Sequence, residues 1–126
     1  MLYDPNWKPA IVPAEVPKLE PWREILIKCA AVIEARGWEK GQYQDIAGRV
    51  CAIGAFRVVQ GSDPRKGRGR ARKYTVAEIR LAKRKLLAVL QLPGTGDESS
   101  RIINWNDQRT TSKRSVLAAL IKAAAQ

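Results

Sequence analysis

Apolar residues recur at helical spacing directly after the proline at position 21. Pro21 suits the first position of a helix, and Gly37 suits the residue that follows the last turn. The apolar residues that share one face between them are Trp22, Ile25, Leu26, Cys29, Val32 and Ile33. This pattern predicts a helix that begins at residue 21 or 22 and ends at residue 36.

The segment from residue 49 to residue 60, RVCAIGAFRVVQ, is apolar nearly all round. Such a pattern is typical of a buried helix, in which Gly54 and the alanines would let another helix approach closely. A short buried strand is the alternative, because Val and Ile are frequent and the run is short. Three glycines and several polar residues between 37 and 48 indicate a connection rather than a long helix.

Helical signals return three times in the second half of the chain. Thr75 and Glu78 have the spacing of a capping box, which predicts a helix running to about Gln91. Residues 99–107 suggest a short helical turn, and a last helix is expected to be capped at Thr111 or Ser112 and to end near residue 125. The predicted fold class is therefore all-α or mostly so, with four to five short helices around one core. Residues 21–126 would form a single helical domain.

Residues 1–20 have a different pattern, in which a proline stands at every fourth position from Pro5 onward. Each proline lacks an amide proton and disfavours helix at the preceding residue, so we expect an extended N-terminal arm. Apolar residues lie between the prolines, whereas disordered tails are normally poor in them. We expect the arm to pack either on its own body, which we favour, or on a partner. The residues expected to contact a partner are Tyr3, Trp7, Ile11 and Val12.

Positive charge is concentrated in one part of the chain. The formal net charge is +11, and residues 64–85 hold ten bases and one acid, which is +9 of that total. Residues 61–74 are predicted to be a basic loop, because glycines and turn residues precede the capping box. The bases continue on the exposed side of the helix that follows. The predicted nucleic-acid-binding residues are Arg65, Lys66, Arg68, Arg70, Arg72, Lys73, Arg80, Lys83 and Arg84.

This segment predicts a non-enzymatic protein that binds nucleic acid mainly through the phosphate backbone. Arginine and lysine side chains in a loop can follow a phosphate backbone and release its counterions, and the guanidinium fork matches phosphate geometry. A solvated charged loop is the plainer alternative, although such loops usually carry mixed charge. Arg68-Gly69-Arg70 resembles the core of an AT-hook, but Ala71 stands where the usual proline would be. RNA is an equally suitable partner.

A second hypothesis is a protein–protein interaction module, such as a phage or mobile-element inhibitor or a small subunit of a larger assembly. In that case the arm would lie along the partner, and the basic loop would meet an acidic protein surface. The sequence favours no particular oligomeric state.

Catalytic, metal and membrane functions have little support in the composition. The chain has no histidine and two cysteines, so the commonest general base and the usual metal-ligand clusters are missing, and we expect no cofactor. The acids Glu39, Asp45 and Asp107 stand alone, and no enzyme is predicted.

No apolar run has the length of a membrane span, and the first residues lack signal-peptide character, so we expect a cytoplasmic protein with buried, reduced thiols. The tryptophans are expected in the core rather than against bases.

Three short motifs resemble those of an uncharacterised family of small bacterial and phage proteins. They are Arg36-Gly37-Trp38 at the end of a helix, the VCxxGA pattern of residues 50–55, and Trp105-Asn106-Asp107 before the last helix. The resemblance covers residues 22–60 and 102–125 and leaves out the arm and the basic loop. It implies one compact domain and no known activity. It also implies that Asn106 or Asp107 bonds the backbone ahead and starts the last helix, and that the basic segment is an addition to the common body.

Overall fold

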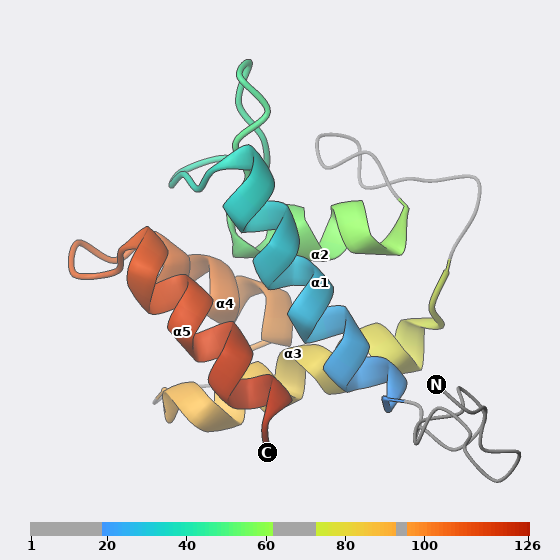
Figure 1. Ribbon diagram of the computed structural model, residues 1–126. Coiled ribbons are helices and arrows are strands. Elements are labelled where there is room, and N and C mark those ends of the chain that lie inside the picture. The colour runs from blue at the N-terminus through green and yellow to red at the C-terminus, as the bar shows by residue number, and fades with distance from the viewer. Residues whose placement is uncertain (1–18, 62–72, 93–95) are drawn as a thin grey trace, which may run out of the picture.

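The computed structural model describes residues 19–61, 73–92 and 96–126, and the fold of these residues is all-α (Figure 1). The predicted fold class is confirmed. Within the described ranges there is no strand, and β-pairing is limited to two isolated bridges. The helices are α1 (Pro21–Arg36), α2 (Ala52–Gln60), α3 (Val76–Leu90), α4 (Glu98–Asn106) and α5 (Lys113–Ala124).

Helix α1 lies at the centre of the molecule and packs against α5, α2 and α3 (Figure 1). It begins at Pro21 and ends before Gly37, as the sequence predicts. Its side chains Ile25, Leu26 and Ile33 are completely buried. Complete burial of such a side chain stabilises the fold by about 1.5–3 kcal/mol. The apolar face of α1 is therefore the main support of the core.

Helices α3 and α5 both begin with capping boxes. The Thr75 hydroxyl accepts a hydrogen bond from the Glu78 amide, and the Glu78 carboxylate accepts one from the Thr75 amide. In α5 the cap is Ser112, while the hydroxyl of Thr111 donates to the Trp105 carbonyl at 2.6 Å. Local side-chain chemistry therefore sets both starts, as predicted, and Ser112 is the cap among the two candidates.

Helix α2 begins at Ala52, three residues later than the sequence predicts. Val50 is instead extended and forms isolated bridges with Trp38 and Gln44. These bridges satisfy the Val50 backbone groups, because its amide donates to the Gly37 carbonyl and its carbonyl accepts from the Glu39 amide. The Cys51 thiol then caps the helix by accepting from the Gly54 amide at 3.3 Å. The predicted helix is therefore confirmed for residues 52–60, and the alternative of a buried strand is wrong because Val50 forms only isolated bridges.

Gly54 is needed for a close approach, but its neighbour is not another helix. A Cβ atom at this position would lie 2.0 Å from the carbonyl oxygen of Tyr43, in the connection between α1 and α2. The same carbonyl accepts a hydrogen bond from the Cys51 amide. Gly54 therefore lets the connection pack directly on α2.

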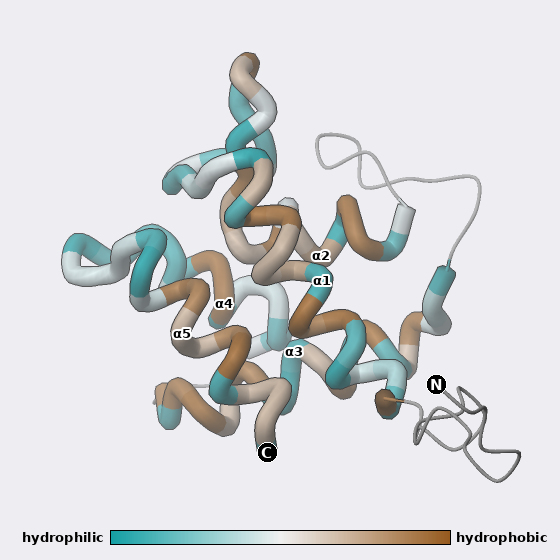
Figure 2. The backbone as a smooth tube through the Cα atoms, in the orientation of Figure 1, coloured by the Kyte–Doolittle hydropathy of each residue, from teal (hydrophilic) through white to brown (hydrophobic). Residues whose placement is uncertain are grey.

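Polar and apolar stretches alternate along the helices in Figure 2, and the tip of the connection between α1 and α2 is apolar. In the turn at residues 46–47 of this connection, Ile46 is 98% exposed. The helices of the described ranges are all too short or too polar to cross a membrane. The predicted contact residues of the N-terminal arm, Tyr3, Trp7, Ile11 and Val12, lie outside the described residues.

Candidate nucleic-acid interface

The two ends of the basic loop, residues 61–74, are held close together on the helical body. The Lys73 amide donates to the carbonyl of Gln60, the last residue of α2, at 3.4 Å. Tyr74 is buried, and its hydroxyl donates to Glu24 and accepts from Lys28 of α1. The predicted binding residues between these ends, Arg65, Lys66, Arg68, Arg70 and Arg72, lie outside the described residues. Lys73 is described and is exposed.

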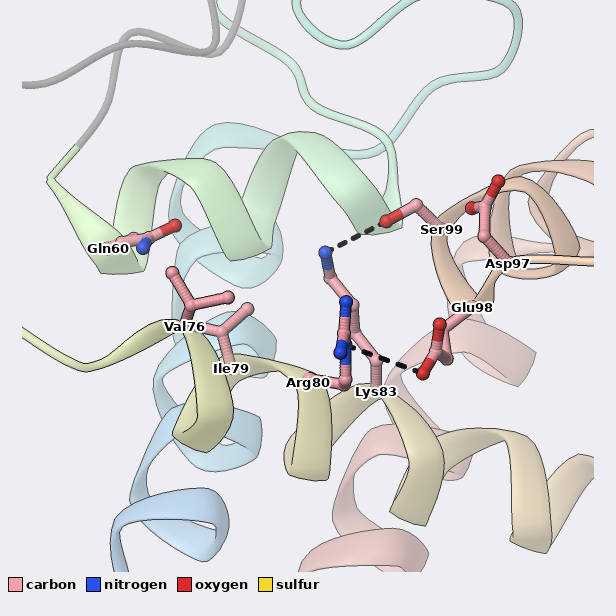
Figure 3. Close-up of a pocket in the computed structure, with 8 residues that line it drawn as sticks. All are labelled: Gln60, Val76, Ile79, Arg80, Lys83, Asp97, Glu98 and Ser99. Atoms are coloured by element: carbon pink, nitrogen blue, oxygen red, sulfur yellow. Dashed lines mark hydrogen bonds and ion pairs between the residues drawn. The ribbon is translucent and has the colours of Figure 1, made fainter.

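The remaining predicted residues, Arg80, Lys83 and Arg84, lie on α3. Figure 3 shows Arg80 and Lys83 projecting toward the start of α4, and Arg84 donates to Glu98 at the same place. Arg84 Nε lies 2.9 Å from Glu98 Oε1, and Arg80 Nε lies 3.7 Å from the same oxygen. The two arginine side chains remain 62% and 58% exposed. Both guanidinium groups therefore reach solvent while sharing one carboxylate.

Glu98 and Asp97 are acids that the start of α4 holds in place. The backbone amide of Glu98 and the Arg84 guanidinium lower the pKa of the Glu98 carboxyl. Asp97 is the N-cap, and it accepts hydrogen bonds from the amide and hydroxyl of Ser100, which lower its pKa. Both acids therefore stand at the N-terminus of α4, where negative charge is favourable. The sequence contains no signal for the Arg84–Glu98 pair, because the partners stand fourteen positions apart in different helices.

Lys83 differs from its two arginine neighbours because it is half-buried. Its ammonium donates to the Ser99 hydroxyl at 2.9 Å and lies 5.8 Å from the centre of the Phe56 ring. Burial and, secondarily, the positive charge of Arg57 lower the pKa of Lys83. The sequence places Lys83 on an exposed face, so its withdrawal toward α4 corrects that prediction. The cause is the contact between α3 and α4, which is non-local.

A cavity of about 370 Å³ lies between the end of α2, α3 and the start of α4, and Arg80, Lys83 and Ser99 are part of its lining. Figure 3 shows the Lys83 side chain extending to Ser99 and Arg80 facing Glu98. Sequence reasoning identifies only the two bases of this lining. Among the described residues, the lining comprises Gln60, Val76, Ile79, Arg80, Lys83, Asp97, Glu98 and Ser99.

Asn106 joins the connection between α1 and α2 to the end of α4. It is completely buried, and its oxygen accepts from Trp38 Nε1 at 2.7 Å and from the Ala52 amide at 3.0 Å. Its side-chain amide donates to the Glu39 carbonyl and to the Asp107 carboxylate. The predicted role in starting the last helix is therefore wrong for Asn106. Apart from the adjacent Asp107, its partners lie far behind it in the chain.

Asp107 also bonds a residue that comes much earlier in the sequence. Its Oδ1 accepts from the Gly41 amide at 3.0 Å as well as from Asn106. The role of starting α5 belongs to Ser112. The three motifs RGW, VCxxGA and WND therefore meet at one structural centre, to which they contribute Trp38, Ala52 and Asn106.

The tryptophans and thiols that the structure describes serve the core. Trp22 and Trp105 are buried, as predicted, and Lys85 covers the Trp22 ring at 4.6 Å. Cys29 and Cys51 are buried free thiols, and burial raises the pKa of each. No cluster of three or more His, Cys, Asp or Glu with metal-binding geometry occurs in the described ranges.

The fold and these contacts define a small all-α protein whose helical body carries the ends of a basic segment. The chain belongs to the family of unknown function DUF6197, whose sequence profile matches residues 17–126. No curated protein and no solved structure matches the chain. The matched range includes the basic segment, so the range itself does not set that segment apart from the family.

Proposed function

We propose that this protein binds nucleic acid through the phosphate backbone, using residues 65–73 and the adjacent face of α3. The observation that carries the proposal is the concentration of ten bases and one acid in residues 64–85. A local excess of this size creates a positive field that attracts a polyanion, and counterion release then stabilises the complex. Contacts of this kind give little sequence readout.

The placement of Lys73, Arg80 and Arg84 supports the proposal. All three are exposed. Lys73 bonds the Gln60 carbonyl, Arg80 lines one cavity with Gln60, and Arg84 shares the Glu98 carboxylate with Arg80. Arg80 and Arg84 share a single carboxylate, so each retains guanidinium donors for phosphate. Lys83 contributes least to this surface, because it is half-buried and bonded to Ser99.

Binding to duplex DNA, single-stranded DNA and structured RNA, measured by fluorescence anisotropy at several salt concentrations, tests the proposal. The test variant changes Arg65, Lys66, Arg68, Arg70, Arg72 and Lys73 to glutamine. A charge-matched variant changes six bases elsewhere: Arg36, Lys40, Arg109, Lys113, Arg114 and Lys122. None of these six forms an ion pair within the described residues.

We expect the test variant to lose binding while the charge-matched variant retains most of it. Equal losses would mean that only the net charge matters, and the proposed interface would then be wrong. If wild-type protein shows no salt-dependent binding to any of the three probes, the proposed function itself fails. The three probes also decide between DNA and RNA.

A protein–protein interaction module is the second candidate, and Ile46 favours it. The turn that carries Ile46 is fixed by Asp45, whose carboxylate accepts from the Arg49 amide at 2.8 Å and from its guanidinium at 2.6 Å. The turn therefore presents a fully exposed apolar side chain on an ordered support. Crosslinking in cell extract after nuclease treatment tests it. A partner captured by wild type and lost with Ile46→Ser supports this candidate.

We further propose that the protein is non-enzymatic and acts in the cytoplasm. The two buried, unpaired thiols suit a reducing compartment. We also propose that the RGW, VCxxGA and WND motifs are shared features of this family and that its members are small bacterial and phage proteins. The convergence of these motifs on Asn106 supports a common structural role.

A further inference from the structure

Among the described residues that line the cavity between α3 and the start of α4, the Lys83 amine has no carboxylate partner. Arg80 and Arg84 both pair with Glu98, and the Asp97 carboxylate bonds Ser100. Lys83 Nζ instead bonds the neutral Ser99 hydroxyl at 2.9 Å. In the part of the chain that the structure describes, no carboxylate lies within 4.0 Å of this amine. The half-buried amine therefore faces an open space of about 370 Å³.

The surroundings of Lys83 disfavour its charged form. Burial has the largest effect on its pKa and lowers it, and the cation Arg57 lowers it further. Three anionic or thiol groups act weakly in the opposite direction. The three opposing groups are Glu98, Cys29 and Asp97. A desolvated lysine beside another cation has the environment that activates amine nucleophiles.

We propose that Lys83 is a nucleophilic amine that forms an imine with a small aldehyde carrying an anionic group. The cavity between α3 and the start of α4 holds this aldehyde. Arg80 lines the same cavity. Its contact with Glu98, at 3.7 Å, leaves guanidinium donors that can bind the anionic group of the ligand. Ser99 holds the nitrogen at the cavity wall. This is a covalent binding site, and it goes beyond the proposed binding of nucleic acid.

The chemistry needs no co-reactant. The lone pair of the neutral Lys83 amine forms a bond to the carbonyl carbon, and the carbonyl π electrons move to oxygen. The nitrogen loses a proton and the oxygen gains one, which gives a carbinolamine. The hydroxyl then takes a proton from solvent and leaves as water as the nitrogen lone pair forms the C=N bond, and loss of the second nitrogen proton returns that proton to solvent and leaves the neutral imine. The balance is one amine and one aldehyde to one imine and one water.

Glyoxylate, a small aldehyde with a carboxylate, is a suitable probe. The full chain is incubated with glyoxylate and sodium cyanoborohydride, whose hydride reduces the imine carbon and fixes the adduct. Peptide mass spectrometry then gives the labelling rate at each lysine across a pH series. The exposed Lys122 on α5 serves as the internal reference within the same molecule.

We expect Lys83 to label several-fold faster than Lys122 at neutral pH, and its rate to reach a plateau at lower pH. Arg80→Gln is expected to slow labelling by glyoxylate while leaving labelling by acetaldehyde, which has no anionic group, unchanged. The proposal is overturned if Lys83 labels no faster than Lys122, or if both rates rise over the same pH range. Because no nucleic acid is present, this result stands apart from the test of nucleic-acid binding.

Discussion

Asn106 is the residue on which the link between α4 and the α1–α2 connection depends. Replacement by alanine leaves the Trp38 indole and the Ala52 amide without their acceptor. Each buried donor left without a partner costs about 1–3 kcal/mol. We therefore expect Asn106→Ala to lower the free energy of unfolding by at least this amount, measured by urea denaturation. Asn104→Ala, at an exposed position of the same helix, should change it by less than about 0.5 kcal/mol. Equal effects of both changes would refute the role given to Asn106.

Gly54 provides a second test at the residue scale. Helix propensity alone would make Gly54→Ala stabilising by about 1 kcal/mol. The added Cβ would lie 2.0 Å from a backbone oxygen, and such overpacking typically costs about 1–3 kcal/mol. We expect a net loss of stability in thermal or urea unfolding. Ala118→Gly, at an exposed site of α5, measures the propensity term in this protein. A more stable Gly54→Ala variant would show that the connection does not pack on α2 as described.

Element boundaries follow from the sequence where the signal is local. Thr75 and Glu78 are three residues apart, and their reciprocal bonds start α3 at the predicted position. The start of α2 is different, because Val50 is held extended by Trp38 and Gln44. The apolar pattern around Val50 does not indicate these bridges. Helix boundaries set by neighbouring side chains can therefore be predicted from the sequence, whereas boundaries set by pairing with a distant segment cannot.

The contact between α3 and α4 makes stability depend on pH. The backbone amide of Glu98 and the Arg84 guanidinium lower the pKa of Glu98 from its ordinary value of 4.5. The stabilisation is therefore complete above pH 4.5 and is lost as the pH falls through the lower, folded-state pKa. Wild type should exceed Glu98→Gln in stability at pH 7 in urea unfolding, and the difference should vanish in acid. Glu34→Gln, an exposed acid on α1, is the charge control. A difference that persists unchanged into strong acid would contradict this interpretation.

The same carboxylate competes with phosphate for Arg80 and Arg84. Glu98→Gln removes the competing charge from two exposed guanidinium groups. We expect it to tighten nucleic-acid binding several-fold at low salt, measured by anisotropy. The Glu34→Gln control changes the net charge equally at a position away from these arginines. Tightening by the control to the same extent would exclude a specific role for Glu98.

At the scale of the whole molecule, sequence patterning predicts the all-α class and the main core residues. Trp22, Ile25 and Leu26 illustrate this, because an amphipathic helix of this length has one way to bury its apolar face. For the candidate site, the sequence predicts the charged residues but not their contacts. The charge of Arg80, Lys83 and Arg84 is evident in the sequence, but their pairing with Glu98 and Ser99 depends on how α3 and α4 meet. The burial of Lys83 follows from that meeting and has no signature in the chain.

The salt dependence of binding tests the central proposal most directly. If all six bases of residues 65–73 contact phosphates of duplex DNA, log K should fall against log salt concentration with a slope of about −5. The variant with these six bases changed to glutamine should lose most of that slope, and the charge-matched variant should keep it. A wild-type slope near zero, or equal slopes for the two variants, would contradict a phosphate-binding interface at the basic segment.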